Sequence, residues 1–170
     1  THMAKTILIT GGSRGIGAAT ARLAGVRGWS VGVNYAGNEP AASETAKAVE
    51  AAGGKAIAIR GDVANEADVV AMFDATEQAF GKLDGVFNNA GIGVGGEIRD
   101  YSIQDWEDVF DVNLRGVVHG VHAVYPLMIE QGFGHIVNTA SMLSFQGGIL
   151  VPSYTASKSA VMGLTRLLAN

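Results

Sequence analysis

Thr10-Gly11-Gly12-Ser13-Arg14-Gly15-Ile16-Gly17 is the stretch that decides the fold, because it connects a short apolar run at 4–10 with an amphipathic run at 15–28. These patterns predict a buried strand before the stretch and a helix after it. Glycine lets the backbone turn tightly and approach a phosphate, and a helix N-terminus offers free N–H donors. The spacing of Gly11, Gly15 and Gly17 differs from the common G-x-G-x-x-G pattern. A merely tight turn is one interpretation, but the strand–loop–helix context favours a phosphate-binding loop.

Short apolar runs alternate with longer amphipathic stretches along the whole chain. Strands are predicted at 4–10, 29–35, 55–61, 83–88 and 134–139, and helices at 15–28, 40–53, 65–80, 103–131 and 152–170. Strands without polar alternation, separated by helices, predict a parallel sheet covered on both faces. We therefore expect an α/β fold, a three-layer, Rossmann-like doubly wound parallel sheet that binds its ligand beyond the carboxyl ends of the strands.

The predicted helix at 103–131 carries the clearest local signals. Ser102-Ile103-Gln104-Asp105 resembles a capping box, in which an acid follows the serine by three residues. Helical spacing predicts that one face of this helix belongs to the core, through Trp106, Val109, Phe110, Val117, Val121 and Val124.

The composition excludes several classes of protein. The 170 residues suffice for one domain, and 48% apolar against 16% charged residues excludes disorder. No apolar run reaches the roughly 18 residues of a membrane span, and the absence of cysteine excludes a disulfide framework and cysteine-ligated metal. A net charge of −4 argues against a nucleic-acid partner. We expect a cytoplasmic protein with a single domain at 4–170, incomplete at its C-terminus, after a tag remnant at 1–3.

The acidic residues are unevenly distributed. All 16 lie between Glu39 and Glu130, so residues 1–38 and 131–170 carry basic side chains and no acid. Chance combined with apolar strands could produce this pattern. The functional interpretation is that both ends of the chain approach an anionic ligand.

Segments at the predicted strand ends indicate a dinucleotide. NAD-specific sites usually place an acid at the end of the second strand, where this chain has Asn34-Tyr35-Ala36. A 2′-phosphate would meet no carboxylate there and could pair with Arg14, unless Arg14 is a solvated loop cation. We therefore expect NADP in preference to NAD, which stays an alternative. Asp62-Val63 could bind adenine or cap a helix, and Asn88-Asn89-Ala90-Gly91 lets the backbone approach a cofactor, with Asn89 largely structural.

Tyr154 and Lys158 are four residues apart at the start of the last predicted helix, so they share one face. A tyrosine beside a cation has its phenolate favoured and can exchange a proton with an alcohol or carbonyl. Ser141, just after the fifth strand, could hydrogen-bond the same substrate oxygen. Asn113 is unusual in a helix interior, and its amide could hold a water for a proton relay. Each residue has an ordinary structural explanation, but together with the glycine loop they predict a proton-transfer site.

These motifs resemble those of the short-chain dehydrogenase/reductase family, across essentially all of residues 4–170. The resemblance implies a catalytic tetrad of Asn113, Ser141, Tyr154 and Lys158. In this tetrad Tyr154 is the general acid/base, while Lys158 binds the nicotinamide ribose and activates the tyrosine. Ser141 orients the substrate oxygen, and Asn113 supports a water-linked proton path. The expected cofactor site consists of Gly11, Ser13, Arg14, Ile16, Gly17, Asn34, Tyr35, Asp62, Val63, Asn89, Ala90, Gly91, Tyr154 and Lys158.

The resemblance also implies hydride transfer between NADP(H) and a small-molecule carbonyl or secondary alcohol, by a homodimer or homotetramer without metal, nucleic acid or membrane. Residues 4–91 are similar to NADP-type bacterial reductases, and 140–158 to sugar-acid and deoxygluconate dehydrogenases. A sugar, sugar acid or related small ketone is therefore expected first, and an acyl-carrier thioester second. Such a mosaic also suggests a recombined or designed chain.

Two alternatives stay open. Members of the family normally continue through two more strands and a substrate-covering segment, so a truncated cofactor-binding fragment without turnover is the alternative to an active enzyme. His119, His122 and His135 could suggest a metal. However, the i, i+3 pair His119 and His122 has no evident carboxylate or third ligand, which favours surface or interface histidines.

Overall fold

The computed structural model describes residues 4–169, which form one five-stranded parallel sheet in the order β3-β2-β1-β4-β5. Each strand lies inside a range predicted from the sequence. The strands are β1 (Thr6–Ile9), β2 (Ser30–Tyr35), β3 (Lys55–Arg60), β4 (Gly85–Asn88) and β5 (His135–Asn138). The chain moves outward from β1 to β3 and then returns to pair β4 with the other side of β1. This reversal places a topological switch point between β1 and β4, where α/β sheets bind ligands.

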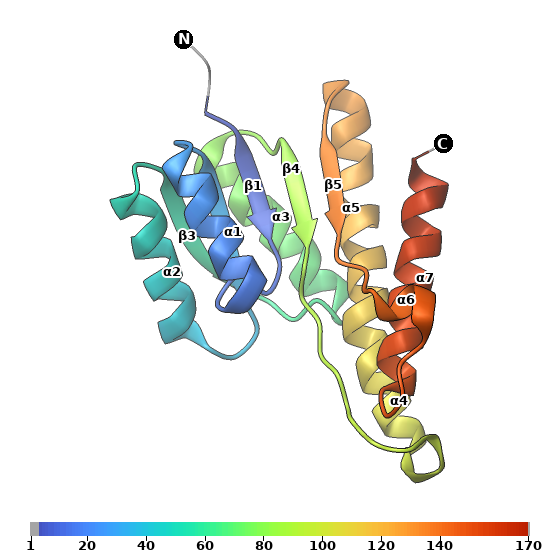
Figure 1. Cartoon of the computed structure of the whole chain (residues 1–170). Helices are drawn as coiled ribbons and strands as arrows, with labels where there is room; N and C mark the ends of the chain where they lie inside the picture. The colour runs from blue at the N-terminus through green and yellow to red at the C-terminus, as the bar shows by residue number, and fades with distance from the viewer. Residues whose placement is uncertain (1–3, 170) are drawn as a thin grey trace.

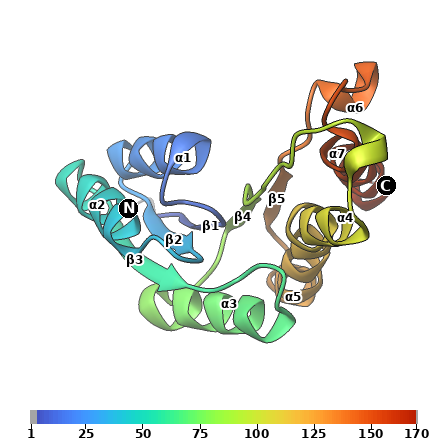
Figure 2. The same cartoon turned by 90° about the horizontal axis from the view of Figure 1, so that it is seen from below.

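Helices cover both faces of the sheet. They are α1 (Gly15–Val26), α2 (Glu39–Ala51), α3 (Glu66–Phe80), α4 (Ile103–Phe110), α5 (Gly116–Gln131), α6 (Leu143–Gln146) and α7 (Pro152–Leu168). α1 and α2 lie on one face, α3 and α5 lie on the other, and α7 lies beside α5 near β5 (Figures 1 and 2). The expected three-layer, Rossmann-like sheet is confirmed. Within residues 4–169, no helix combines the length and apolar character that crossing a bilayer requires.

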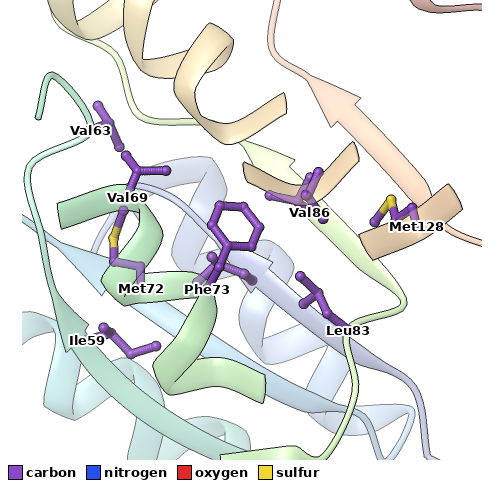
Figure 3. Close-up of a cluster of buried hydrophobic side chains, with 10 residues drawn as sticks. Ile59, Val63, Val69, Met72, Phe73, Leu83, Val86 and Met128 are labelled. Carbon is purple, nitrogen blue, oxygen red and sulfur yellow. The ribbon is translucent and has the colours of Figure 1, made fainter. Parts of the chain in front are cut away.

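Two apolar clusters hold these layers together. Leu8 of β1 packs with Met72, Leu83 and Val86 on the α3 and α5 side (Figure 3). Its neighbour Ile9 packs on the opposite face, against α1 and α2. Successive residues of a strand point to opposite faces, so a strand that is apolar at both positions is buried on both sides.

The long helix predicted at 103–131 is interrupted in the structure. Asp111–Arg115 form a π-helical segment, η2, between α4 and α5. The predicted capping box is confirmed, since Ser102 Oγ accepts from Asp105 N and the Asp105 carboxylate accepts from Ser102 N. The predicted core positions are buried at Val109, Val117, Val121 and Val124, whereas Trp106 and Phe110 are half-buried. Apolar periodicity alone could not predict the π segment, because a single wide turn barely shifts the pattern.

Two short elements escaped prediction. The 3-10 turn η1 (Ile98–Asp100) follows β4, and α6 follows β5. Both lie in connections at the carboxyl ends of the strands, and both are shorter than the window over which periodicity can be recognised.

Candidate active site

The loop after β1 has the tight geometry that its glycines predict. Gly11 has φ +62°, a conformation that L side chains rarely adopt. A Cβ on Gly17 would collide with the Gly11 carbonyl oxygen and lie 2.7 Å from Asn89 Nδ2. The first turn of α1 therefore packs directly on the loop, with its free N–H groups at the carboxyl end of the sheet.

Asn89, the first residue after β4, fastens this loop across the switch point. Its Nδ2 donates to Thr10 O at 3.1 Å and to Gly11 O at 3.3 Å. The Thr10 hydroxyl accepts in return from the N–H groups of Asn89 and Ala90, at 2.9 and 3.0 Å. These contacts agree with the largely structural role expected for Asn89.

An open cavity of about 410 Å³ lies over this junction. Its predicted lining residues are Gly11, Ser13, Arg14, Ile16, Tyr35, Asn89, Ala90, Gly91, Tyr154 and Lys158. It is also lined by Gly15, Ala36, Gly37, Asn38, Ile92 and Thr139, which the sequence analysis did not assign to the site. Each of these directly adjoins a predicted segment or a strand end, so the rule that ligands bind at carboxyl strand ends could have found them. The described lining includes the cations Arg14 and Lys158 and no carboxylate.

Lys158 is buried at the wall of this cavity. Its side chain is 3% exposed, and its Nζ donates to Thr139 O at 2.8 Å. The same Nζ lies 5.8 Å from the centre of the Tyr154 ring, as the four-residue spacing on α7 predicts. Burial lowers the pKa of Lys158 below its ordinary value of 10.5, because the charged form loses hydration. The arrangement presents a weakly hydrated cation to the tyrosine.

Asn113 is fully buried in the π segment, and its amide oxygen and nitrogen both make hydrogen bonds within the protein. Its Oδ1 accepts from Ile92 N at 2.8 Å, and its Nδ2 donates to Ile92 O at 2.9 Å and to Ser157 Oγ at 3.1 Å. Both amide hydrogens are therefore used by the protein. The side chain ties the connection after β4 to α7, the helix that carries Tyr154 and Lys158.

Gly91 is where these segments converge. A Cβ on Gly91 would lie 3.3 Å from Asn113 Oδ1 and 3.5 Å from Lys158 Nζ. Two residues further on, a Cβ on Gly93 would lie 3.6 Å from the Tyr154 ring. The structure thus brings together three of the four predicted catalytic residues, from η2 and α7.

Ser141 does not line the cavity. It follows Thr139 by two residues, and its Oγ accepts from Leu143 N at 3.2 Å at the start of α6. Its predicted contact with a substrate oxygen therefore stays a prediction.

Comparison with known proteins decides the family. A family model described as short chain dehydrogenase matches residues 5–170. The chain belongs to the short-chain dehydrogenase/reductase family. It is 44% identical over 168 residues to 2-dehydro-3-deoxy-D-gluconate 5-dehydrogenase of Dickeya dadantii (strain 3937), covering 98% of this chain and 65% of that protein. It is 37% identical over 167 residues to a 3-oxoacyl-acyl-carrier-protein reductase of Staphylococcus aureus (strain Mu50 / ATCC 700699), covering 98% and 68% respectively.

A solved structure agrees in fold. A short-chain dehydrogenase/reductase from Burkholderia phymatum in complex with NAD superposes with a TM-score of 0.93 at 41% identity, covering 97% of this chain and 59% of that one. The chain therefore spans roughly two thirds of the length of these relatives.

The described residues fit a dinucleotide such as the NAD bound in the Burkholderia phymatum structure. The cavity joins a glycine loop at a helix N-terminus to two cations, which suits a pyrophosphate and a ribose. A Cβ on Gly15 would meet no atom within 4 Å, so the loop is open toward the cavity at this point. The fit holds for NAD and NADP alike.

Four predicted cofactor residues lie outside the cavity lining. Gly17 and Asn34 are buried behind the loop. Asp62 is exposed, and its Oδ1 accepts from Ala64 N at 3.0 Å in a local turn. Val63 is buried, and its carbonyl accepts from His119 Nδ1 at 2.9 Å when that nitrogen is protonated.

His119, His122 and His135, the histidines within residues 4–169, form no cluster that would suggest a metal. His119 contacts a backbone carbonyl, and His122 Nδ1 lies 3.6 Å from Glu66 Oε1. Across residues 4–169, no group of three or more histidine and acidic side chains is placed to hold a metal ion.

Proposed function

We propose that this chain transfers a hydride between NADP(H) and a carbonyl or secondary alcohol. One observation carries the proposal: the cavity that begins at the glycine loop ends at Tyr154 and Lys158. A group that binds phosphate and a group that moves a proton therefore share one space. Cofactor binding alone does not explain why a lysine is buried beside a tyrosine in that space, whereas proton transfer does.

The residues of the chain divide the work. When bound, the dinucleotide supplies or accepts the hydride. The Tyr154 hydroxyl donates its proton to the carbonyl oxygen during reduction, and the Tyr154 phenolate removes the alcohol proton during oxidation. The Lys158 ammonium stabilises the resulting phenolate, and Ser141 orients the substrate oxygen. Asn113 holds the backbone of Ile92 in place at the wall of the cavity.

The preference for NADP rests on the end of β2. Tyr35, Ala36, Gly37 and Asn38 line the cavity beside Arg14, so a 2′-phosphate would meet a cation and no carboxylate there. Arg14→Ala should weaken NADPH binding about tenfold and NADH binding much less, because only the phosphate contact is lost. Arg22→Ala removes the same charge from the exposed side of α1 and serves as the control. Equal weakening of both dinucleotides would contradict the preference.

The substrate class is proposed from the relatives. Sugars and sugar acids come first, since the more similar of the two curated relatives is a deoxygluconate dehydrogenase. Acyl-carrier thioesters come second, in line with the reductase of Staphylococcus aureus. The homodimer or homotetramer and the cytoplasmic location expected from the sequence stay predictions.

A steady-state assay tests the activity. The chain is supplied with NADPH or NADH and a panel of keto acids, ketoses and 3-oxoacyl thioesters, and oxidation of the dinucleotide is followed. Tyr154→Phe should reduce turnover at least about 100-fold, because the proton donor is lost. Tyr125→Phe removes an exposed hydroxyl from α5 and should leave turnover unchanged. NADPH binding without turnover of any carbonyl would instead favour a cofactor-binding chain without catalysis.

A further inference from the structure

Asn34 is a buried amide whose polar atoms are all in use. It is the second-last residue of β2 and is 2% exposed. Its Oδ1 accepts from Gly11 N at 3.0 Å, and its Nδ2 donates to Gly61 O at 2.9 Å and also contacts the sulfur of Met72. The side chain does not line the cavity, although the neighbouring Tyr35 does. Asn34 therefore cannot touch a ribose in the way that a residue at the end of this strand is expected to do.

The oxygen end of Asn34 controls the start of the glycine loop. Its side-chain oxygen accepts a hydrogen bond from the N–H of Gly11, and its main-chain carbonyl accepts one from the N–H of Gly12 at 2.8 Å. One residue of β2 thus accepts from the N–H groups of both Gly11 and Gly12. The donors that stay available to an anion are then those at the start of α1, where the helix leaves N–H groups without partners. The orientation of the loop toward its ligand depends on this pair of bonds.

The nitrogen end of Asn34 holds the connection after β3. Gly61 accepts from the amide and also donates its own N–H to Tyr35 O at 2.9 Å. A Cβ on Gly61 would lie 2.7 Å from the sulfur of Met72, so this glycine is pressed against α3. Asp62, for which the sequence left adenine binding and helix capping open, follows immediately. The amide of Asn34 therefore spans β2 and ties the phosphate loop to the next connection along the sheet.

We propose that Asn34 is a positioning residue for the dinucleotide: it holds the phosphate loop and the Gly61 connection in one fixed arrangement without contacting the ligand. This inference rests on the proposed function, because it assumes that the loop binds a dinucleotide. The chemistry favours a neutral amide at this position. An ionised carboxylate could accept from Gly11 but could not donate to Gly61, and an apolar side chain would leave both buried partners unsatisfied.

The test compares two buried substitutions in the same strand. Asn34→Leu is close in size and removes both hydrogen bonds, whereas Val31→Ala removes apolar contacts far from the loop. Both should lower the melting temperature. Only Asn34→Leu should raise the Kd for NADPH, by about tenfold in a fluorescence titration, and leave turnover at saturating NADPH nearly unchanged. In the ligand-free protein, amide hydrogen exchange at Gly11 should be faster in Asn34→Leu than in Val31→Ala or the unchanged chain.

Several outcomes would overturn the inference. An unchanged Kd in Asn34→Leu, or an equal rise in Val31→Ala, would show that Asn34 contributes only general stability. Should Asn34→Leu fail to fold, Asn34→Ser is measured in the same way, because a hydroxyl is too short to reach Gly11 and Gly61 together. If the unchanged chain binds neither NADPH nor NADH, the proposed function fails. Exchange at Gly11 then still decides whether Asn34 holds the loop.

Discussion

Replacing Asn113 with leucine tests how the π segment serves the site. The side chain is fully buried and makes three hydrogen bonds, two to the backbone of Ile92 and one to Ser157. At about 1 kcal/mol each, their loss should lower the free energy of unfolding by about 3 kcal/mol. Ile92 is 39% exposed, so water can replace part of the hydrogen bonds that its backbone loses. The free energy of unfolding should therefore not fall by more than this amount. Leucine fills nearly the same volume, which keeps the contribution of a cavity small.

Urea denaturation measures the loss, with Val124→Ala as the control. Val124 is also fully buried, lies on α5 beyond the π segment and does not line the cavity. Its truncation should cost about 2 kcal/mol. Turnover should fall strongly in Asn113→Leu and remain near normal in Val124→Ala, when both are assayed at a temperature at which they are folded.

Hydrogen exchange then separates two ways in which Asn113 could act. If Asn113 works by holding the connection after β4, exchange at Ile92 should become faster in Asn113→Leu while exchange in β1 stays slow. Lost turnover with unchanged exchange at Ile92 would refute this reasoning. It would favour a direct part for Asn113 in a proton path, which is the role expected from the sequence.

Three further substitutions should change cofactor binding, stability or turnover in a direction that the structure predicts. Gly17→Ala should abolish NADPH binding in a calorimetric titration, because its Cβ would collide with the carbonyl of Gly11. Gly163→Ala on α7 is the control. Its Cβ would meet no atom, so it should leave binding unchanged and be neutral or slightly stabilising in a calorimetric melt. Ser102→Ala should lower the free energy of unfolding by about 1 kcal/mol in urea, through loss of the α4 cap, and leave the KM for NADPH unchanged. Lys158→Met should end turnover and make the fold more stable near pH 7. The folded-state pKa of Lys158 lies below 10.5, so the unfolded chain binds its proton more tightly, and the stability of the unchanged chain rises with pH up to about 10.5. The advantage of Lys158→Met should therefore shrink between about pH 7 and about pH 10, and an advantage that grows over this range would contradict the burial argument.

The elements that the sequence predicts well are those with long periodic patterns or explicit caps. The Asn65 side chain accepts from Asp68 N at the start of α3, which lies inside the range predicted at 65–80, and the predicted Ser102 cap starts α4. The π segment and α6 have neither signal. A π turn adds one residue to a helix whose apolar stripe continues on both sides, so only a polar side chain out of place at Asn113 marks it.

For the site, the sequence predicts which residue types take part but not which way each side chain points. Asn34 and Tyr35 are neighbours on a strand, so they must face opposite sides. Nothing in the sequence says which of the two faces the cavity, because both are plausible partners for a ribose. In the structure, the Asn34 side chain faces away from the cavity, because it bonds to the N–H of Gly11 and the carbonyl of Gly61. Long-range contacts of this kind depend on strand order, which local patterns do not encode.

Charge is the property for which sequence and structure correspond most directly. The cavity is lined by residues 11, 13–16, 35–38, 89–92, 139, 154 and 158, and all but 89–92 come from the two stretches without acids. The absence of acids from these stretches affects Lys158 most directly. Its ammonium is buried against a carbonyl oxygen, at a cost in hydration that lowers its pKa. A carboxylate in the same cavity would relieve that cost by forming an ion pair, and it would also withdraw the positive charge from Tyr154 and repel a pyrophosphate. Keeping acids out of both chain segments leaves the cation available to the tyrosine and to an anionic ligand, at the expense of stability that Lys158→Met should restore.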